Sequence, residues 1–225
     1  MIRGWRNLAL GPTLLENAAH DLQRRSRWSL SEFDRTLWTL VSVEEDERIW
    51  RSETGDVLVL SRLDELPELK TWRNDEAVQR DARTLAASSD AALLLAEREA
   101  VDGRVVVRVI YKKQDDSLGY TYTGLRFTSD GGTGCALMTV VAKEGDLAGA
   151  REAAVLERLE RAGTPVRRDE RGRMRGWYVD PYDARLDDRT IATVADADRF
   201  DAVVPEHPLT RVRKALISLD PDALD

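Results

Sequence analysis

The stretch LLLAEREAVDGRVVVRVIY, residues 93–111, decides the fold. Two runs rich in apolar and β-branched residues, Leu93 to Val101 and Arg104 to Tyr111, flank the dipeptide Asp102-Gly103. Asp-Gly between such runs is among the strongest local signals for a β-hairpin, because its two-residue turn requires positive φ angles. The sequence therefore predicts two antiparallel strands joined at Asp102-Gly103.

Two further strands extend this hairpin into a four-stranded meander. The strand pattern returns at residues 120–128 and 135–143, and the connections are rich in Gly, Asp and Ser. In the strand from Arg104 to Tyr111, one face is apolar and the other carries Arg104 and Arg108. A strand buried on both sides would be apolar on both faces. We therefore expect helices to cover one face of the sheet deeply and the other in part.

A second hairpin and several helices surround the meander in sequence. The hairpin joins Ile49-Trp50 to residues 57–60 through a turn that contains Gly55. Helical spacing predicts helices over about 13–26, 74–87 and 147–162 and a last helix that begins near Pro208, while residues 28–38 are ambiguous. The predicted fold class is α+β: an antiparallel sheet made of a hairpin and a four-stranded meander, covered by helices as an α/β/α sandwich.

Domain organisation follows from the absence of a separating linker. No stretch is rich enough in Gly, Ser or Pro to divide the chain, so we expect a single domain over residues 1–225. Within it we expect an N-terminal helical segment at 1–44, a core sandwich at 45–163, and a C-terminal arm and helix at 164–225.

Composition limits the classes of function. The net charge is −7, which argues against a protein whose main task is sequence-independent binding of nucleic acid. No apolar run reaches the length of a membrane span, and the first 21 residues lack the pattern of a secretory signal. We therefore expect a cytoplasmic protein. The excess of Arg over Lys is typical of a GC-rich bacterial genome.

Two sets of residues, read together with the order of elements, resemble a known family. The first set begins with Lys112, Gly119, Tyr122 and Gly124 and continues with Glu144, Gly145, Gly149, Arg151, Glu152 and Ala153. The second runs from Asp201 to Arg213 and includes His207-Pro208, with Phe200 and Val204 departing from the usual pattern. Both are similar to the uncharacterised bacterial branch of the PsbP-like α/β/α sandwich. The resemblance implies a fold used mainly to bind other macromolecules, with no activity shared across it.

One group of charged residues at a strand-to-helix junction is a candidate site. Glu144, Arg151 and Glu152, with Lys112 beside them, could serve acid–base chemistry or bind a small molecule. The same residues could instead form capping contacts and ion pairs that fix the helix to the sheet. The sequence leaves both interpretations open.

Other catalytic arrangements find little support. No His or Cys pair has metal-ligand spacing, so we predict neither a metal nor another cofactor. Cys135 lies in an apolar run typical of a buried residue, and His207 is expected to cap the last helix. Gly131, Gly132 and Gly134 fit a hairpin turn rather than a phosphate-binding loop.

Residues 158–175, here called the basic segment, contain seven Arg and three acidic residues. Aromatic residues follow at Trp177, Tyr178 and Tyr182, a combination that suits an acidic protein surface or single-stranded nucleic acid. It also fits a plain solvated helix end and loop. Candidate binding residues here are Arg173, Arg175 and Trp177, and the acidic total favours a protein partner over nucleic acid.

The sequence thus favours a non-enzymatic protein-binding or accessory protein in the cytoplasm. The alternative is a small-molecule-binding protein or hydrolase with a site near Glu144, Arg151 and Glu152.

Overall fold

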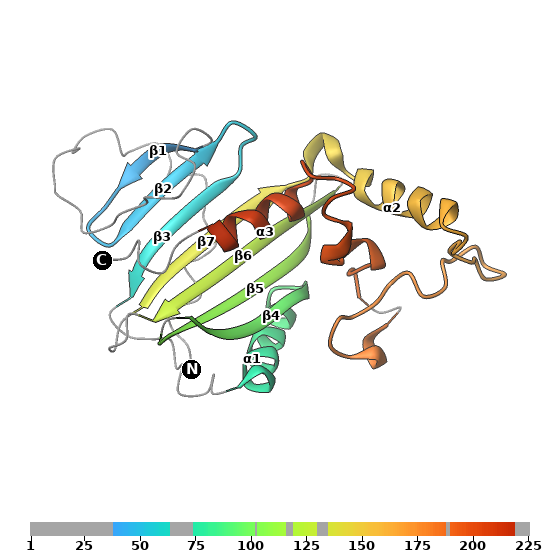
Figure 1. The fold of residues 1–225 in the computed structure, drawn as a ribbon, viewed down its shortest axis with the longest axis horizontal. Helices are drawn as coiled ribbons and strands as arrows, with labels where there is room; N and C mark the ends of the chain where they lie inside the picture. Colours follow the sequence, from blue (N-terminus) through green and yellow to red (C-terminus); the bar gives the residue numbers. More distant parts are fainter. Residues whose placement is uncertain are drawn as a thin grey trace.

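A computed structural model of the chain describes residues 38–63, 74–101, 103–115, 119–129, 135–187 and 190–218. Within these residues a single antiparallel sheet has the strand order β1-β2-β3-β7-β6-β5-β4 (Figure 1). Its strands are β1 (Trp38–Val43), β2 (Glu47–Ser52), β3 (Val57–Leu63), β4 (Ala91–Val101), β5 (Arg104–Asp115), β6 (Gly119–Ser129) and β7 (Cys135–Lys143). The sheet and its helices confirm the predicted α+β class.

Both predicted hairpins are present. β4 pairs with β5 around Gly103, whose φ is 79°, and β2 pairs with β3 around Gly55, whose φ is 83°. Positive φ is the conformation that glycine adopts without steric cost. β3 then pairs with β7, which joins the N-terminal hairpin to the edge of the meander in one sheet.

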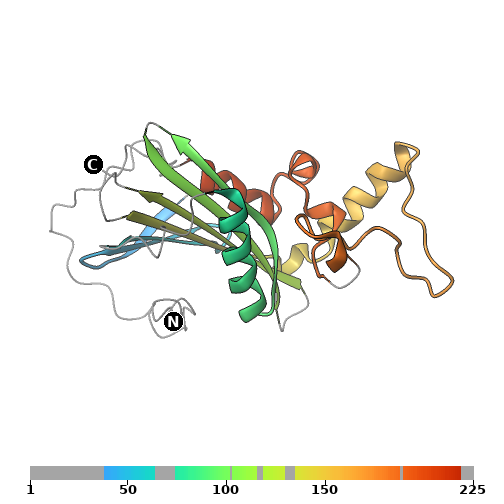
Figure 2. The ribbon, with the colours of Figure 1, turned by 90° about the horizontal axis from the view of Figure 1, so that it is seen from below.

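Helices cover both faces of this sheet. α1 (Asp75–Ser88) packs on β4 and β5, and α3 (Pro208–Ser218) packs on the opposite face over β6 and β7 (Figure 2). Alternate strand residues supply the two cores: Val109 lies in the core under α1, and its neighbour Ile110 lies in the core under α3. The α/β/α sandwich therefore has the arrangement that the strand periodicity predicts.

α1 forms where its capping residues and apolar spacing agree. The Asn74 side chain accepts a hydrogen bond from the Ala77 N–H at 2.9 Å, and Asp75 and Glu76 lie in the positively polarised first turn. Val78 and Ala82 lie on the buried face, directed at the sheet.

α3 approaches the sheet unusually closely at Gly124. A Cβ atom added there would lie 2.6 Å from Cγ1 of Val212 and 2.9 Å from Cδ1 of Leu216, so only glycine leaves room for the helix. Nη1 of the buried Arg126 donates to the Leu216 carbonyl at 2.8 Å and thereby satisfies part of the C-terminal end of α3.

α2 (Ala150–Arg161) extends beyond the end of the sheet (Figure 1) and has a small core of its own. Gly149 precedes it with a φ of 74°, and a 3-10 turn at Gly145–Leu147 replaces the first turn of the helix predicted from 147. The buried members of its core are Val155, Trp177, Ala195 and Phe200.

The N-terminal and C-terminal boundaries differ from the expectation. Residues 38–43, expected within a helical segment over 1–44, form β1, while the helix predicted at 13–26 lies outside the described residues. Thr39, Leu40 and Val41 of β1 are all exposed, so this edge strand lacks the alternating burial that would reveal it in sequence. α3 supplies one layer of the sandwich, so the core does not end at residue 163.

In the part of the chain that the structure describes, every helix is too short or too polar to span a bilayer. Cys135 is buried, as predicted, and lies in the core under α1.

Candidate functional site

Charged side chains gather at the end of the sheet from which α2 extends. β5 and β7 end here and β6 begins here, and the loops around residues 194–207 cover them. We call this group the buried hub, with the members Lys112, Glu144, Arg151, Glu152, Asp196, Asp201 and His207.

Lys112 on β5 is fully buried and pairs with two carboxylates. Its Nζ lies 2.9 Å from Oδ2 of Asp196 and 3.4 Å from Oε1 of Glu152, and it sits 4.1 Å from the ring centroid of Tyr120. The Thr193 N–H donates to Oδ2 of Asp196 at 2.8 Å and holds that carboxylate in place. Burial alone would lower the pKa of Lys112, but Asp196 and Glu152 outweigh it, so the pKa is raised and the amine stays protonated.

Glu144 follows β7 and is approached by three groups, two from β6 and one from His207. Its Oε1 accepts a hydrogen bond from the Tyr122 hydroxyl at 2.7 Å, and its Oε2 accepts one from the Tyr120 N–H at 3.2 Å. Nε2 of His207 lies 3.3 Å from Oε1, at ion-pair distance but without the alignment of a hydrogen bond. Burial raises the pKa of Glu144, and the approach of His207 and the Tyr122 hydrogen bond outweigh it, so the net shift is downward.

The tautomer of His207 follows from its other nitrogen. Nδ1 accepts a hydrogen bond from the Leu209 N–H at 3.2 Å, so a neutral ring carries its proton on Nε2, facing Glu144. This bond also confirms the prediction that His207 caps the last helix. The ring meets Tyr122 edge-on, with centroids 5.5 Å apart.

Arg151 on α2 is also fully buried, and all its nitrogens have partners. Nε donates to the Ala195 carbonyl at 2.6 Å, Nη1 to Oγ1 of Thr210 at 2.9 Å, and Nη2 to the Ala197 carbonyl at 3.1 Å and to Oδ1 of Asp201 at 2.7 Å. One guanidinium thus joins α2, the 194–201 loop and α3. A buried Arg with this many charge-assisted bonds is typical of a structural clamp.

The structure divides the four predicted junction residues among separate contacts. Lys112 and Glu152 lie together, whereas Glu144 bonds Tyr122 and Arg151 bonds the 195–201 loop. Glu144, Arg151 and Glu152 do not pair with one another in any contact that the structure records. As binding residues, all four stay a prediction.

Asp196 was not predicted as a site residue from the sequence, although it is the nearest partner of Lys112. A signal existed in the spacing Thr193-x-x-Asp196, which forms a capping box here. Asp201 appeared only in the tail motif, and His207 was predicted to cap the last helix but not to approach Glu144.

The buried hub is closed to solvent at its cationic groups. Lys112, Arg151 and His207 have no exposed side-chain surface, and Glu144 is 3% exposed. Oε2 of Glu152 differs from these groups, because it is a buried carboxylate oxygen without a hydrogen-bond partner. No group of three or more His, Cys, Asp or Glu suited to a metal ion occurs among the described residues.

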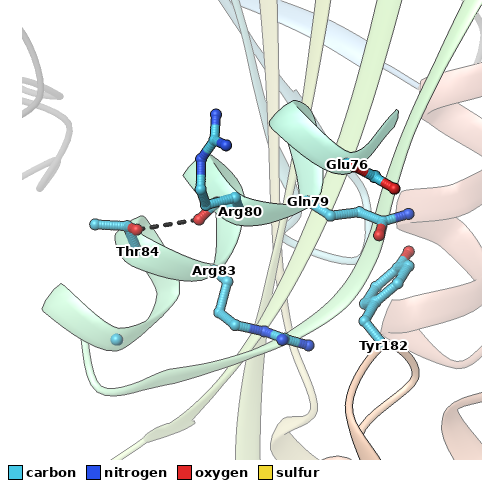
Figure 3. A pocket seen from close by; sticks show the side chains of 7 residues that line it. Glu76, Gln79, Arg80, Arg83, Thr84 and Tyr182 are labelled. Atoms are coloured by element: carbon cyan, nitrogen blue, oxygen red, sulfur yellow. Dashed lines mark hydrogen bonds between the residues drawn. The ribbon is translucent and has the colours of Figure 1, made fainter. Parts of the chain in front are cut away.

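An open groove of about 540 Å³ lies elsewhere, along the outer face of α1 (Figure 3). Its lining residues are Glu76, Gln79, Arg80, Arg83, Thr84, Ala87 and Tyr182. Nη2 of Arg83 pairs with Oδ1 of Asp180 at 2.8 Å, and the Tyr182 hydroxyl accepts from the Ala96 N–H at 2.6 Å. These contacts attach the 180–187 loop to α1 and β4, which explains the groove as the seam between them.

The basic segment presents all of its arginines to solvent. The exposed side chains are Arg158, Arg161, Arg167, Arg168, Arg171, Arg173 and Arg175. Trp177, predicted to bind alongside Arg173 and Arg175, is instead 1% exposed in the core of α2. Its indole packs in one cluster with Val155 and Phe200, while Tyr178 and Tyr182 are partly buried.

Comparison with solved structures gives distant similarities, among them one to a PsbP protein. No protein-family model matches the chain, and no curated protein matches it. The solution structure of cyanobacterial PsbP (CyanoP) from Synechocystis sp. PCC 6803 is 16% identical, with a TM-score of 0.34, over 48% of this chain and 71% of that one. It is a PsbP protein, of the fold family that the sequence motifs resemble, and the likeness concerns the fold alone.

Proposed function

We propose that this chain is a non-enzymatic protein-binding or accessory protein of the bacterial cytoplasm. One observation carries the proposal: the charged groups that could perform chemistry are bound to one another inside the molecule, while seven arginines of the basic segment face solvent. Arg161 and Arg173 pair with Glu157 and Asp169, and the exposed positive charge of the other five is available to a binding partner.

The buried hub supports this choice over a hydrolase. A general acid or base must come within hydrogen-bond reach of its substrate, directly or through one water. Lys112, Arg151 and His207 offer no surface for such an approach, and their hydrogen-bonding atoms are directed at protein groups.

One feature still favours a ligand site, the unpartnered Oε2 of Glu152. Glu152→Gln separates the two functions. If the carboxylate binds a ligand, the variant loses ligand binding or turnover at an unchanged melting temperature. If Glu152 serves only Lys112, the variant loses stability instead.

The protein-binding proposal itself is tested with the full chain in its own host. The tagged protein is expressed at native abundance, captured, and its retained proteins are quantified against a tag-only control. The candidate partner is then purified and mixed with the chain. We expect a complex of fixed stoichiometry by size-exclusion chromatography with light scattering. Capture of no host protein above the control would contradict the proposal.

A further inference from the structure

The tip of the basic segment is an ordered hairpin. Arg168 and Met174 form an antiparallel bridge, the Asp169 N–H donates to the Arg173 carbonyl at 2.9 Å, and the Arg175 N–H donates to the Arg167 carbonyl at 2.8 Å. We call residues 167–175 the arginine hairpin. It projects away from the sheet (Figure 2, orange).

This register places Arg167 directly opposite Arg175. Cross-strand partners in an antiparallel pair have their side chains on the same face, and like charges directly opposite destabilise the pair. Among the described residues, neither guanidinium forms an ion pair or a side-chain hydrogen bond. The hairpin thus holds two positive charges together without an internal counter-charge.

The hairpin contains two acidic residues, Asp169 and Glu170. Glu170 is exposed at the turn and forms no ion pair that the structure records, whereas Asp169 is already bonded within the hairpin. Asp169 accepts hydrogen bonds from the Arg171 and Arg173 N–H groups at 2.9 Å each and from Nε of Arg173 at 3.0 Å. These bonds lower the pKa of Asp169, with the backbone bond from Arg173 first among the causes. Asp169 therefore shapes the turn and pairs with Arg173, which leaves Arg167 and Arg175 for an external anion.

Nucleic acid is a poor match for this surface. Binding of single strands combines a basic groove with aromatic side chains that stack on the bases. Trp177 is buried, Tyr178 packs partly buried against the core of α2, and Tyr182 packs against the core under α1 with its hydroxyl bonded to β4.

We propose that the arginine hairpin binds an acidic polypeptide segment, with carboxylates received between Arg167 and Arg175. The inference rests on the proposed protein-binding function and names the surface and the partner chemistry. A planar guanidinium matches a carboxylate with two parallel hydrogen bonds, so the two side chains together accept a short run of Glu or Asp.

The test measures fluorescence anisotropy of a labelled 15-residue poly-glutamate peptide with the full chain at low and at physiological ionic strength. We expect binding that weakens as salt rises and that falls about tenfold or more in Arg167→Glu/Arg175→Glu. The matched control is Arg51→Glu/Arg80→Glu, which reverses the same number of exposed charges away from the hairpin and should change affinity less than about twofold.

Four results would overturn the inference. An equal loss in the control pair would mean that net charge alone drives the binding. Tighter binding of a labelled 15-nucleotide oligothymidine, lost in the hairpin variant, would assign the surface to nucleic acid. No binding of poly-glutamate at low salt would exclude the acidic segment. A host partner that the hairpin variant retains fully would overturn this inference while leaving the protein-binding function standing.

Discussion

Lys112 shows how a buried charge can specify a fold without serving chemistry. Its ammonium has lost all contact with water, and Asp196 and Glu152 compensate for that loss. A buried ion pair contributes little net stability compared with an apolar replacement of the whole pair, but removing one partner leaves an uncompensated charge. Replacing one partner of the pair should therefore lower the stability of the fold much more than replacing the whole pair.

We predict that Lys112→Ala lowers the free energy of unfolding by about 3–5 kcal/mol, because Asp196 is then buried without its cation. Urea denaturation of the purified variant measures this. Lys113→Ala, on the exposed neighbouring position, is the control and should stay within about 0.5 kcal/mol of the wild type. A loss in Lys112→Ala no larger than in the control would show that the pair at Asp196 is not formed in solution.

The lowered pKa of Glu144 leads to a separate prediction about the stability of the protein at low pH. Its folded-state pKa lies below the ordinary value of 4.5, so the unfolded chain binds the proton more tightly. The stabilisation is therefore present above pH 4.5 and is lost as pH falls through the folded-state pKa. Glu144→Gln should remove this part of the pH dependence, so the wild type and the variant should converge in stability as pH falls through the folded-state pKa of Glu144. Parallel curves over that range would contradict the assignment.

At the scale of elements, the contact of α3 with β6 depends on one missing side chain. Gly124→Ala adds a methyl group where Val212 already stands 2.6 Å away, so the helix must shift. We expect a loss of about 1–3 kcal/mol in urea denaturation, typical of overpacking.

The same contact provides its own control. Val212→Ala removes the atom that the new methyl group meets first, so the double variant Gly124→Ala/Val212→Ala should lose less than the sum of the two single losses by about 1 kcal/mol. Additive losses would mean that α3 does not approach β6 as closely as described.

The meander was predictable because its signals are local. Asp102-Gly103 and the alternation around Val109 act within a few residues, and both agree with the observed strands. β1 was missed because an exposed edge strand needs no apolar alternation. The role of α3 was only partly visible, since its spacing predicts a helix but not the face of the sheet that Gly124 leaves open.

The candidate site was harder to predict than the fold. Lys112 and Asp196 are 84 residues apart, and no pattern along the chain indicates which acidic residue pairs with which basic residue. The sequence predicts a contact correctly where the two partners are close along the chain, as for His207 and the Leu209 N–H. Trp177 misled the prediction because the same residue type suits a binding surface and a small core.

At the scale of the whole molecule, α2 and its small core are joined to the sheet mainly through charged groups. The apolar cluster around Val155 and Trp177 contains no strand residue. The connection to the sheet runs instead through Lys112 on β5, which pairs with Asp196 and Glu152, and Arg151 connects α2 to α3. Polar contacts of this kind fix the position of α2 but bury little apolar surface. We therefore expect α2 and its small core to unfold locally before the sheet does.

Arg151→Ala tests this division by amide hydrogen exchange. The variant leaves the Ala195 and Ala197 carbonyls without their buried donor, so protection should fall in α2 and in residues 194–203 while β5 and β6 keep theirs. Arg158→Ala, an exposed residue on the same helix, should leave both regions unchanged. If Arg151→Ala lowers protection equally in the sheet and in α2, the molecule unfolds as one cooperative unit. The arginine hairpin would then be carried by the sandwich itself rather than by a part that opens separately.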